Sequence, residues 1–98
     1  MAVVPRSCPV CGHPATLTDW GPHLPWIGVE GCGCSGFFVW APLVDGRLPR
    51  LDRAEREALA ANIRSVRAMG REAWLTCAEP DRLFGRLVIL AERPDRPT

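Results

Sequence analysis

Lysine and tyrosine are absent from this 98-residue sequence, and neither sign of charge dominates it. The twelve basic residues are all arginine and stand against eleven acidic ones, which leaves a formal net charge of +1. A balance so close to neutral argues against a protein that binds polyanions through bulk charge. Because every cation is a guanidinium, each can make planar bidentate contacts and stack on aromatic rings.

Long hydrophobic runs are also missing. The longest apolar stretches, FFVWAPLV and LVILA, are too short to cross a bilayer, so no membrane partner is expected. Met1–Ser7 has no apolar run of the kind found in signal peptides, which predicts a cytoplasmic protein. Five cysteines cannot all pair with one another, and disulfides are uncommon in the cytoplasm. The cysteines therefore indicate a metal site or a redox pair rather than a disulfide framework.

Four of the five cysteines form two short pairs in the first half of the chain. Two residues separate Cys8 from Cys11, and one residue separates Cys32 from Cys34. Structural zinc is held tetrahedrally by four thiolates, and each pair can supply two of them from one tight turn. The spacing predicts one structural zinc ion bound by these four cysteines. His13 is a reserve ligand if Cys32 or Cys34 points away.

A thiol redox role for the C-x-x-C pair is the competing interpretation. Redox motifs of the thioredoxin type need the pair at a junction between a strand and a helix. The segment GHPAT, which follows Cys11, carries no helix signal. Catalysis at the metal is also disfavoured, because four thiolates fill a tetrahedral shell and leave no open position. We therefore expect a protein that is not an enzyme and has no small-molecule substrate.

The chain changes character near Pro49, and the part before it is rich in glycine, aromatic and β-branched residues. Three short strands are expected there, at Thr16–Trp20, Trp26–Glu30 and Phe37–Ala41. The sequence thus predicts a small α+β protein, with a zinc-ribbon-type, three-stranded antiparallel sheet followed by one or two helices. The expected organisation is a zinc ribbon in residues 1–48, a helical segment packed on it in residues 49–93, and a tail in residues 94–98.

A capping-box pattern begins the first expected helix, where Asp52 is followed three residues later by Glu55. The helix is expected to end near Met69, with Gly70 as the residue after its C-cap. At about 100° per residue, one side collects apolar residues and another collects arginines. The apolar side, expected to face the sheet, holds Ala58, Leu59, Ile63, Val66 and Met69. The arginine stripe, expected to point outward, holds Arg53, Arg56, Arg64, Arg67 and Arg71.

A second helix is expected from Thr76, because Glu79 follows three residues later and Pro80 falls in the first turn. Apolar residues then recur at helical spacing, although the segment LVIL fits a strand equally well. Residues 80–91 therefore stay open between helix and strand. Cys77, at the start of this element, is expected to be a small buried hydrophobe.

The motif CPVCG, followed by VEGCGCSGFF and then by LDRAEREALAANIR, resembles a known kind of module. Small zinc ribbons of this kind occur at the N-terminus of many uncharacterised bacterial and phage-encoded proteins. Cys8, Cys11 and Cys34 match their ligand pattern directly, whereas Cys32 is displaced by one position. The resemblance implies a zinc-bound ribbon packed on a helix, usually serving as an adaptor to another domain.

Two kinds of partner fit such a module. Three of the four tryptophans, Trp20, Trp26 and Trp40, lie in the expected ribbon, and exposed aromatic residues mark protein interfaces. The alternative is a nucleic-acid-binding ribbon, in which the helix arginines contact phosphates and nearby tryptophans stack on bases. Because the net charge is close to zero, we place a protein–protein adaptor first.

Overall fold

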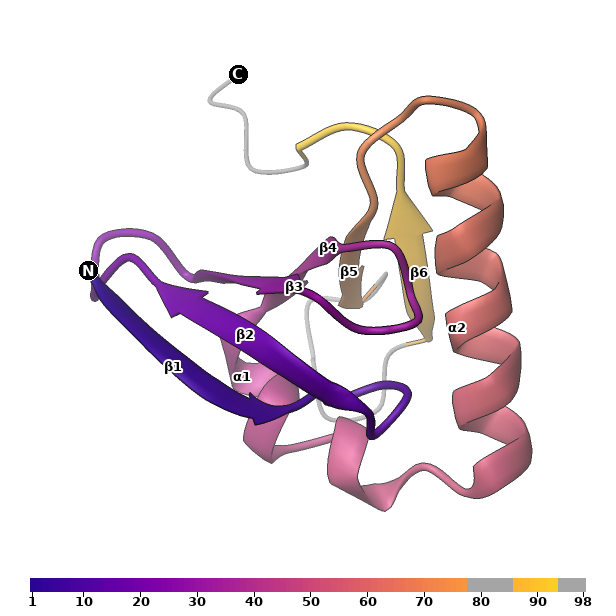
Figure 1. Ribbon diagram of the computed structural model, residues 1–98, viewed down its shortest axis with the longest axis horizontal. Helices are drawn as coiled ribbons and strands as arrows, with labels where there is room; N and C mark the ends of the chain where they lie inside the picture. The colour runs from indigo at the N-terminus through magenta and orange to yellow at the C-terminus, as the bar shows by residue number, and fades with distance from the viewer. Residues whose placement is uncertain (78–85, 94–98) are drawn as a thin grey trace.

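The structure is a computed structural model that describes residues 1–77 and 86–93. This part of the chain contains six strands, two α-helices and a short 3-10 helix (Figure 1). In chain order they are β1 (Ala2–Ser7), β2 (Pro14–Asp19), β3 (Trp26–Glu30), β4 (Phe37–Trp40), α1 (Ala41–Asp45), η1 (Leu48–Arg50), α2 (Arg53–Ala68), β5 (Trp74–Cys77) and β6 (Leu87–Leu90). Within these residues, no helix combines the length and the apolar character needed to span a bilayer.

The strands form one mixed sheet in which the order in space follows the order in the chain, from β1 to β6. Neighbouring strands are antiparallel except for β4 and β5, which are parallel and are connected through α1, η1 and α2. In an antiparallel meander the chain reverses at alternate ends of the sheet. The β1–β2 turn and the β3–β4 turn therefore lie at the same end, and these are the two turns that carry the cysteine pairs.

The small α+β class is confirmed, but the prediction of a three-stranded sheet is wrong. β1, which precedes the first cysteine pair, was not expected. All six of its residues are exposed, so it has no buried face that an alternating apolar pattern would mark in the sequence. The second helix does not begin at Thr76, because Thr76 and Cys77 belong to β5. Residues 87–90 form β6, as the strand interpretation of LVIL requires. The rest of the expected second helix falls on residues 78–85, which lie outside the described residues.

The start of α2 is as predicted. The Asp52 carboxylate accepts from the N–H of Glu55 at 2.8 Å, and the Glu55 carboxylate accepts from the N–H of Asp52 at 2.9 Å. Met69 is the C-cap, and Gly70 follows it with a φ of 76°, a left-handed conformation that favours glycine. The helix therefore begins and ends where local sequence chemistry places it.

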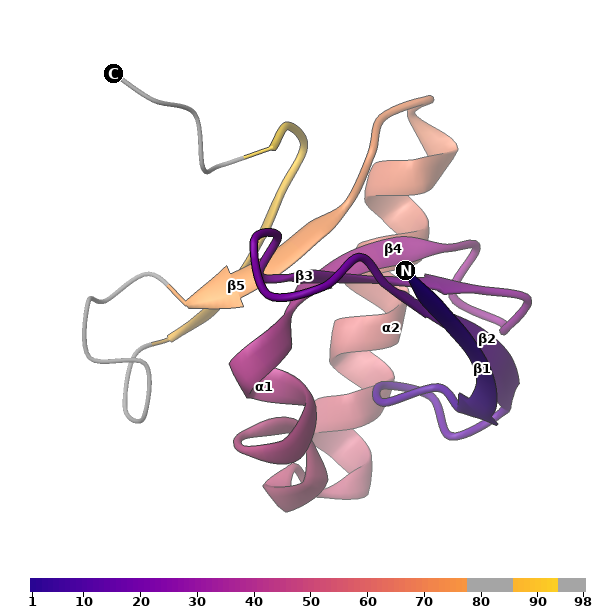
Figure 2. The ribbon, with the colours of Figure 1, turned by 90° about the vertical axis from the view of Figure 1, so that its left-hand side faces the viewer.

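The main core lies between α2 and one face of the sheet, and Figure 2 shows α2 running behind the strands. Alternate residues of the strands point to this face, and they pack with two predicted helix residues, Leu59 and Ile63. The sheet residues of this cluster include Leu17, Ile27, Val29, Phe37, Val39 and Leu75. Val66 is half-buried against the core, whereas Ala58 and Met69, expected on the same side, are exposed. Cys77 is buried, as expected.

Candidate metal centre and aromatic hollow

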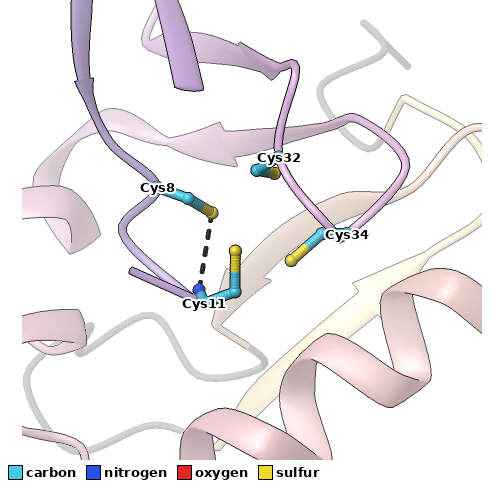
Figure 3. Close-up of side chains that lie close together, drawn as sticks. All are labelled: Cys8, Cys11, Cys32 and Cys34. Carbon is cyan, nitrogen blue, oxygen red and sulfur yellow. Dashed lines mark hydrogen bonds between the residues drawn. The ribbon is translucent and has the colours of Figure 1, made fainter. Parts of the chain in front are cut away.

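The four cysteines of the two pairs converge at the end of the sheet where their turns meet (Figure 3). Their Sγ atoms all lie within 4.8 Å of one another. A tetrahedral zinc ion with Zn–S bonds of about 2.3 Å holds its sulfur atoms about 3.8 Å apart. The cluster therefore fits one zinc ion, with Cys8, Cys11, Cys32 and Cys34 as its ligands.

The first turn is shaped by backbone hydrogen bonds around Cys8. Its N–H donates to the carbonyl of His13 at 2.7 Å, and its carbonyl accepts from the N–H of Gly12 at 2.9 Å. The N–H of Cys11 approaches the Cys8 Sγ to 3.5 Å (Figure 3), and the N–H of Val10 approaches it to 3.4 Å. Donors placed in this way favour the thiolate form, which is the form that binds a metal.

The second turn, residues 31–36, reverses sharply. Gly31, Ser35 and Gly36 all have positive φ values, of 84°, 70° and 86°. Ser35 is the only non-glycine residue with a positive φ in the described part of the chain. These left-handed residues flank the second pair and let two cysteines separated by a single glycine, Cys32 and Cys34, supply sulfur to one point. Cys34 is fully buried and Cys32 half-buried.

The surroundings drive the pKa values of three thiols apart. The pKa of Cys8 is lowered to about 5, chiefly by a hydrogen bond with the Cys34 thiol and also by the backbone N–H groups of Cys11 and Val10, which together outweigh the effect of burial. Burial raises the pKa of Cys32 to about 11. The hydrogen bond with Cys8, together with burial, raises the pKa of Cys34 above its usual range. Of these three thiols Cys8 forms a thiolate most readily, and zinc binding must displace the protons of Cys32 and Cys34.

His13 lies beside the centre without joining the sulfur cluster. Among the described residues, the group that could hold a metal consists of the four cysteines alone. His13 is exposed, and its Nδ1 lies 4.0 Å from where a Cβ on Gly33 would stand. Four sulfur atoms complete a structural zinc shell, so the arrangement does not require the reserve ligand.

Arginines of α2 reach both cysteine turns. Arg56 Nη1 donates to the carbonyls of Pro9 at 2.9 Å and Val10 at 3.4 Å, inside the first turn. Arg67 Nε donates to the carbonyl of Ser35 at 3.2 Å, inside the second. The prediction that Arg56 points outward is therefore wrong. A helical wheel gives the direction of a Cβ, but a long guanidinium side chain can turn back along the surface to reach buried carbonyls.

The rest of the arginine stripe is less available than the sequence suggests. Arg53 is exposed and forms an ion pair with Glu57 at 3.2 Å, one turn further along α2. Arg67 also donates to the carbonyl of Arg71 at 3.1 Å. Arg64 is exposed, and no hydrogen bond or ion pair joins it to another described residue. Arg53, Arg56 and Arg67 thus already have acceptors within the chain.

An aromatic cluster, separate from the main core, occupies the sheet face that points away from α2. The rings of Phe38 and Trp74 are stacked with centroids 4.0 Å apart, and Trp26 meets Trp74 edge-on at 5.2 Å. Trp20 lies beside Phe38 at 6.1 Å. Trp26 and Trp74 are buried, yet neither belongs to the main core cluster. The two faces of the sheet thus carry separate apolar clusters.

An aromatic hollow of about 170 Å³ opens in this cluster. It is lined by Trp20, Leu24, Trp26, Phe38, Trp74 and Arg93. Of these residues, Trp20 and Leu24 are 37% and 36% exposed, whereas Trp26 is 4% exposed. Trp40, expected at the same surface, instead packs half-buried against the main core. Trp74 was not predicted, because its strand pairs with β4 only after the long α2 crossover.

Comparison of the chain with models of known protein families, with curated proteins and with solved structures gives no match. The resemblance to bacterial and phage zinc ribbons therefore rests on the cysteine and helix motifs alone. The metal centre and the aromatic hollow are supported by the geometry of this chain.

Proposed function

We propose that this protein is a zinc-stabilised, non-enzymatic interaction module that binds a partner protein through the aromatic hollow. The zinc ion has a structural role, because four thiolates leave it no open position for substrate or water. The observation that carries the proposal is the hollow itself. An apolar recess with partly exposed aromatic walls, separate from the main core, has the character of a protein-binding site.

The size of the hollow limits what it can take. A volume of about 170 Å³ accommodates one aliphatic side chain of a partner, not a drug-sized ligand. Burying one such side chain contributes about 1.5–3 kcal/mol. Micromolar affinity requires about 8 kcal/mol, so contacts of the partner along the rim must supply the remainder. We therefore propose an extended protein segment that inserts a single aliphatic residue beside Trp20.

A peptide library displayed on phage and selected on the zinc-loaded protein tests this proposal. Enriched peptides should share an aliphatic residue, and synthetic copies should bind at least tenfold more weakly to Trp20→Ala and Leu24→Ser. Met69→Ser is the matched control, because Met69 is also an exposed apolar residue, at 67%, but is the C-cap of α2 and does not line the aromatic hollow. Peptides that bind Trp20→Ala as tightly as the wild type would refute the hollow as the binding site.

The same variants separate protein from nucleic acid as the partner. Arg64→Glu reverses a charge on α2, on the other side of the sheet from the hollow. With zinc kept in excess, so that every variant is metal-loaded, binding of a peptide at the aromatic hollow should be unchanged in Arg64→Glu. If a labelled oligonucleotide binds the wild type and loses affinity in Arg64→Glu but not in Trp20→Ala, the nucleic-acid function is favoured instead.

A further inference from the structure

We propose that Arg56 and Arg64 of α2 act as the counter-charge of the zinc centre and set how tightly the metal is held. This inference rests on the zinc site of the proposed function. It concerns a second hollow, separate from the aromatic one, which lies between the first cysteine turn and α2 and measures about 510 Å³. In the rest of this subsection, the hollow means this second one. Its lining includes Cys11, His13, Arg53, Arg56, Glu57 and Arg64.

A zinc ion bound by the four cysteines would give the site a negative charge. One Zn²⁺ with four thiolates carries a net charge of about −2. A charge of this size at the edge of a small core needs nearby cations, since an uncompensated charge next to apolar residues is costly. Cys11, one of the four cysteines of the cluster, lines the hollow together with Arg56 and Arg64.

The side chains that line the hollow carry an excess of positive charge. Arg53 and Glu57 form an ion pair, so their charges largely cancel. Among the described residues, no carboxylate lies within ion-pair distance of Arg56 or Arg64. The hollow therefore holds two positive charges without a carboxylate partner, beside a centre whose charge is about −2 when zinc is bound. With the metal in place little net charge remains to attract a phosphate.

Arg56 is held against the first cysteine turn. Its guanidinium is half-buried and donates to four backbone carbonyls: Pro9 at 2.9 Å, Val10 at 3.4 Å, Leu48 at 2.6 Å and Leu51 at 3.2 Å. Carbonyls satisfy its hydrogen bonds but do not neutralise its charge. Pro9 and Val10 lie between the two cysteines of the first turn, so the guanidinium both holds this turn and brings a positive charge to it.

Zinc retention in the full chain tests the proposal. The zinc-loaded protein is mixed with excess chelator, the rate of metal release is followed, and apparent affinity is measured by competition. Removing a partner of the metal ligands typically lowers metal affinity 10–100-fold. Arg64 is exposed and acts through its charge alone, so Arg64→Gln should release zinc about two- to fivefold faster. Arg56→Gln also loses the hydrogen bonds to Pro9 and Val10 and should release it about tenfold faster. Arg64→Lys and Arg56→Lys keep the charge and should recover much of the loss.

Arg50→Gln is the matched control, because Arg50 is exposed, does not line this hollow and carries the same charge. The Arg64→Gln effect should shrink as salt is raised, since salt screens an exposed charge and would not alter a lost packing contact. Arg64 is exposed, so its variants keep the fold even if Arg56→Gln does not. If the wild type binds zinc but Arg64→Gln releases it at the rate of Arg50→Gln, the inference is overturned. A wild type that binds no zinc would instead refute the proposed function.

Discussion

Removing the zinc ion is expected to unfold the end of the sheet that carries the cysteines. Cys8 and Cys34 are 2% and 0% exposed and belong to the main core cluster, as does Val10 between the first pair. Loss of the metal should thus expose part of the main core as well as release the two cysteine turns. β1 has six exposed residues and buries little of its own, so its position depends on β2 and on the turn that the metal fixes.

The magnitude decides how far unfolding spreads. Structural zinc contributes on the order of 10–16 kcal/mol to small zinc-binding peptides at neutral pH. The net stability of a folded domain is about 5–15 kcal/mol, and a chain of 98 residues buries a small core. The two values are similar, so the zinc-free chain should retain little or no net stability. We therefore expect the backbone amides of β1 to β4 to lose their protection from hydrogen exchange entirely, and α2 to become at best marginally stable.

Hydrogen exchange followed by mass spectrometry, before and after complete chelation, measures this directly. Tryptophan fluorescence gives a second readout, because Trp26 and Trp74 are 4% and 7% exposed and their emission should shift to longer wavelength on unfolding. Cys77→Ala should still bind one zinc ion and keep its exchange pattern, because Cys77 lies outside the cluster. An unchanged thermal melt and exchange pattern after full removal of the metal would show that zinc does not hold this fold.

Further expectations concern the helix, the hollow and pH. Asp52→Ala removes the capping box and should lower the free energy of unfolding by about 1 kcal/mol in urea titrations. Ile63→Asp places an unpaired charge at a fully buried position and should abolish cooperative unfolding in the same titrations. A Cβ at residue 28 would lie 2.8 Å from the ring of Trp20, so Gly28→Val should displace that ring and weaken peptide binding while zinc content stays at one ion per chain. Zinc binding displaces protons from thiols, so metal retention should be complete at neutral pH and fall as the pH is lowered, which dialysis and metal analysis can follow.

The features that sequence predicts correctly here are local. The α2 boundaries follow from the reciprocal hydrogen bonds of Asp52 and Glu55 and from the left-handed conformation of Gly70, all decided within one turn of helix. Trp26–Glu30 is the one expected strand whose bounds match, and it is the most completely buried. The buried face of α2 follows from the spacing of Leu59 and Ile63.

The features missed depend on distant parts of the chain. β1 has no apolar face, and what places it is its pairing with β2, from Ala2 opposite Asp19 to Ser7 opposite Pro14. β5 pairs in parallel with β4 across the whole of α2, a contact that no window of sequence contains. The Thr76 segment imitates a helix start because the Thr-x-x-Glu spacing is a local signal, and tertiary pairing overrides it.

The ligand set shows how topology can replace spacing as the decisive argument. The second pair, with one intervening residue, departs from the C-x-x-C spacing of the first, so spacing alone leaves His13 as an alternative ligand. Antiparallel pairing of β1 with β2, β2 with β3 and β3 with β4 brings both turns to the same end of the sheet whatever their spacing. The positive φ values of Gly31, Ser35 and Gly36 then reverse the second turn within six residues. Arg67 binds the carbonyl of Ser35, the residue whose conformation is the least favourable of the three, and so α2 holds the strained part of the turn in place.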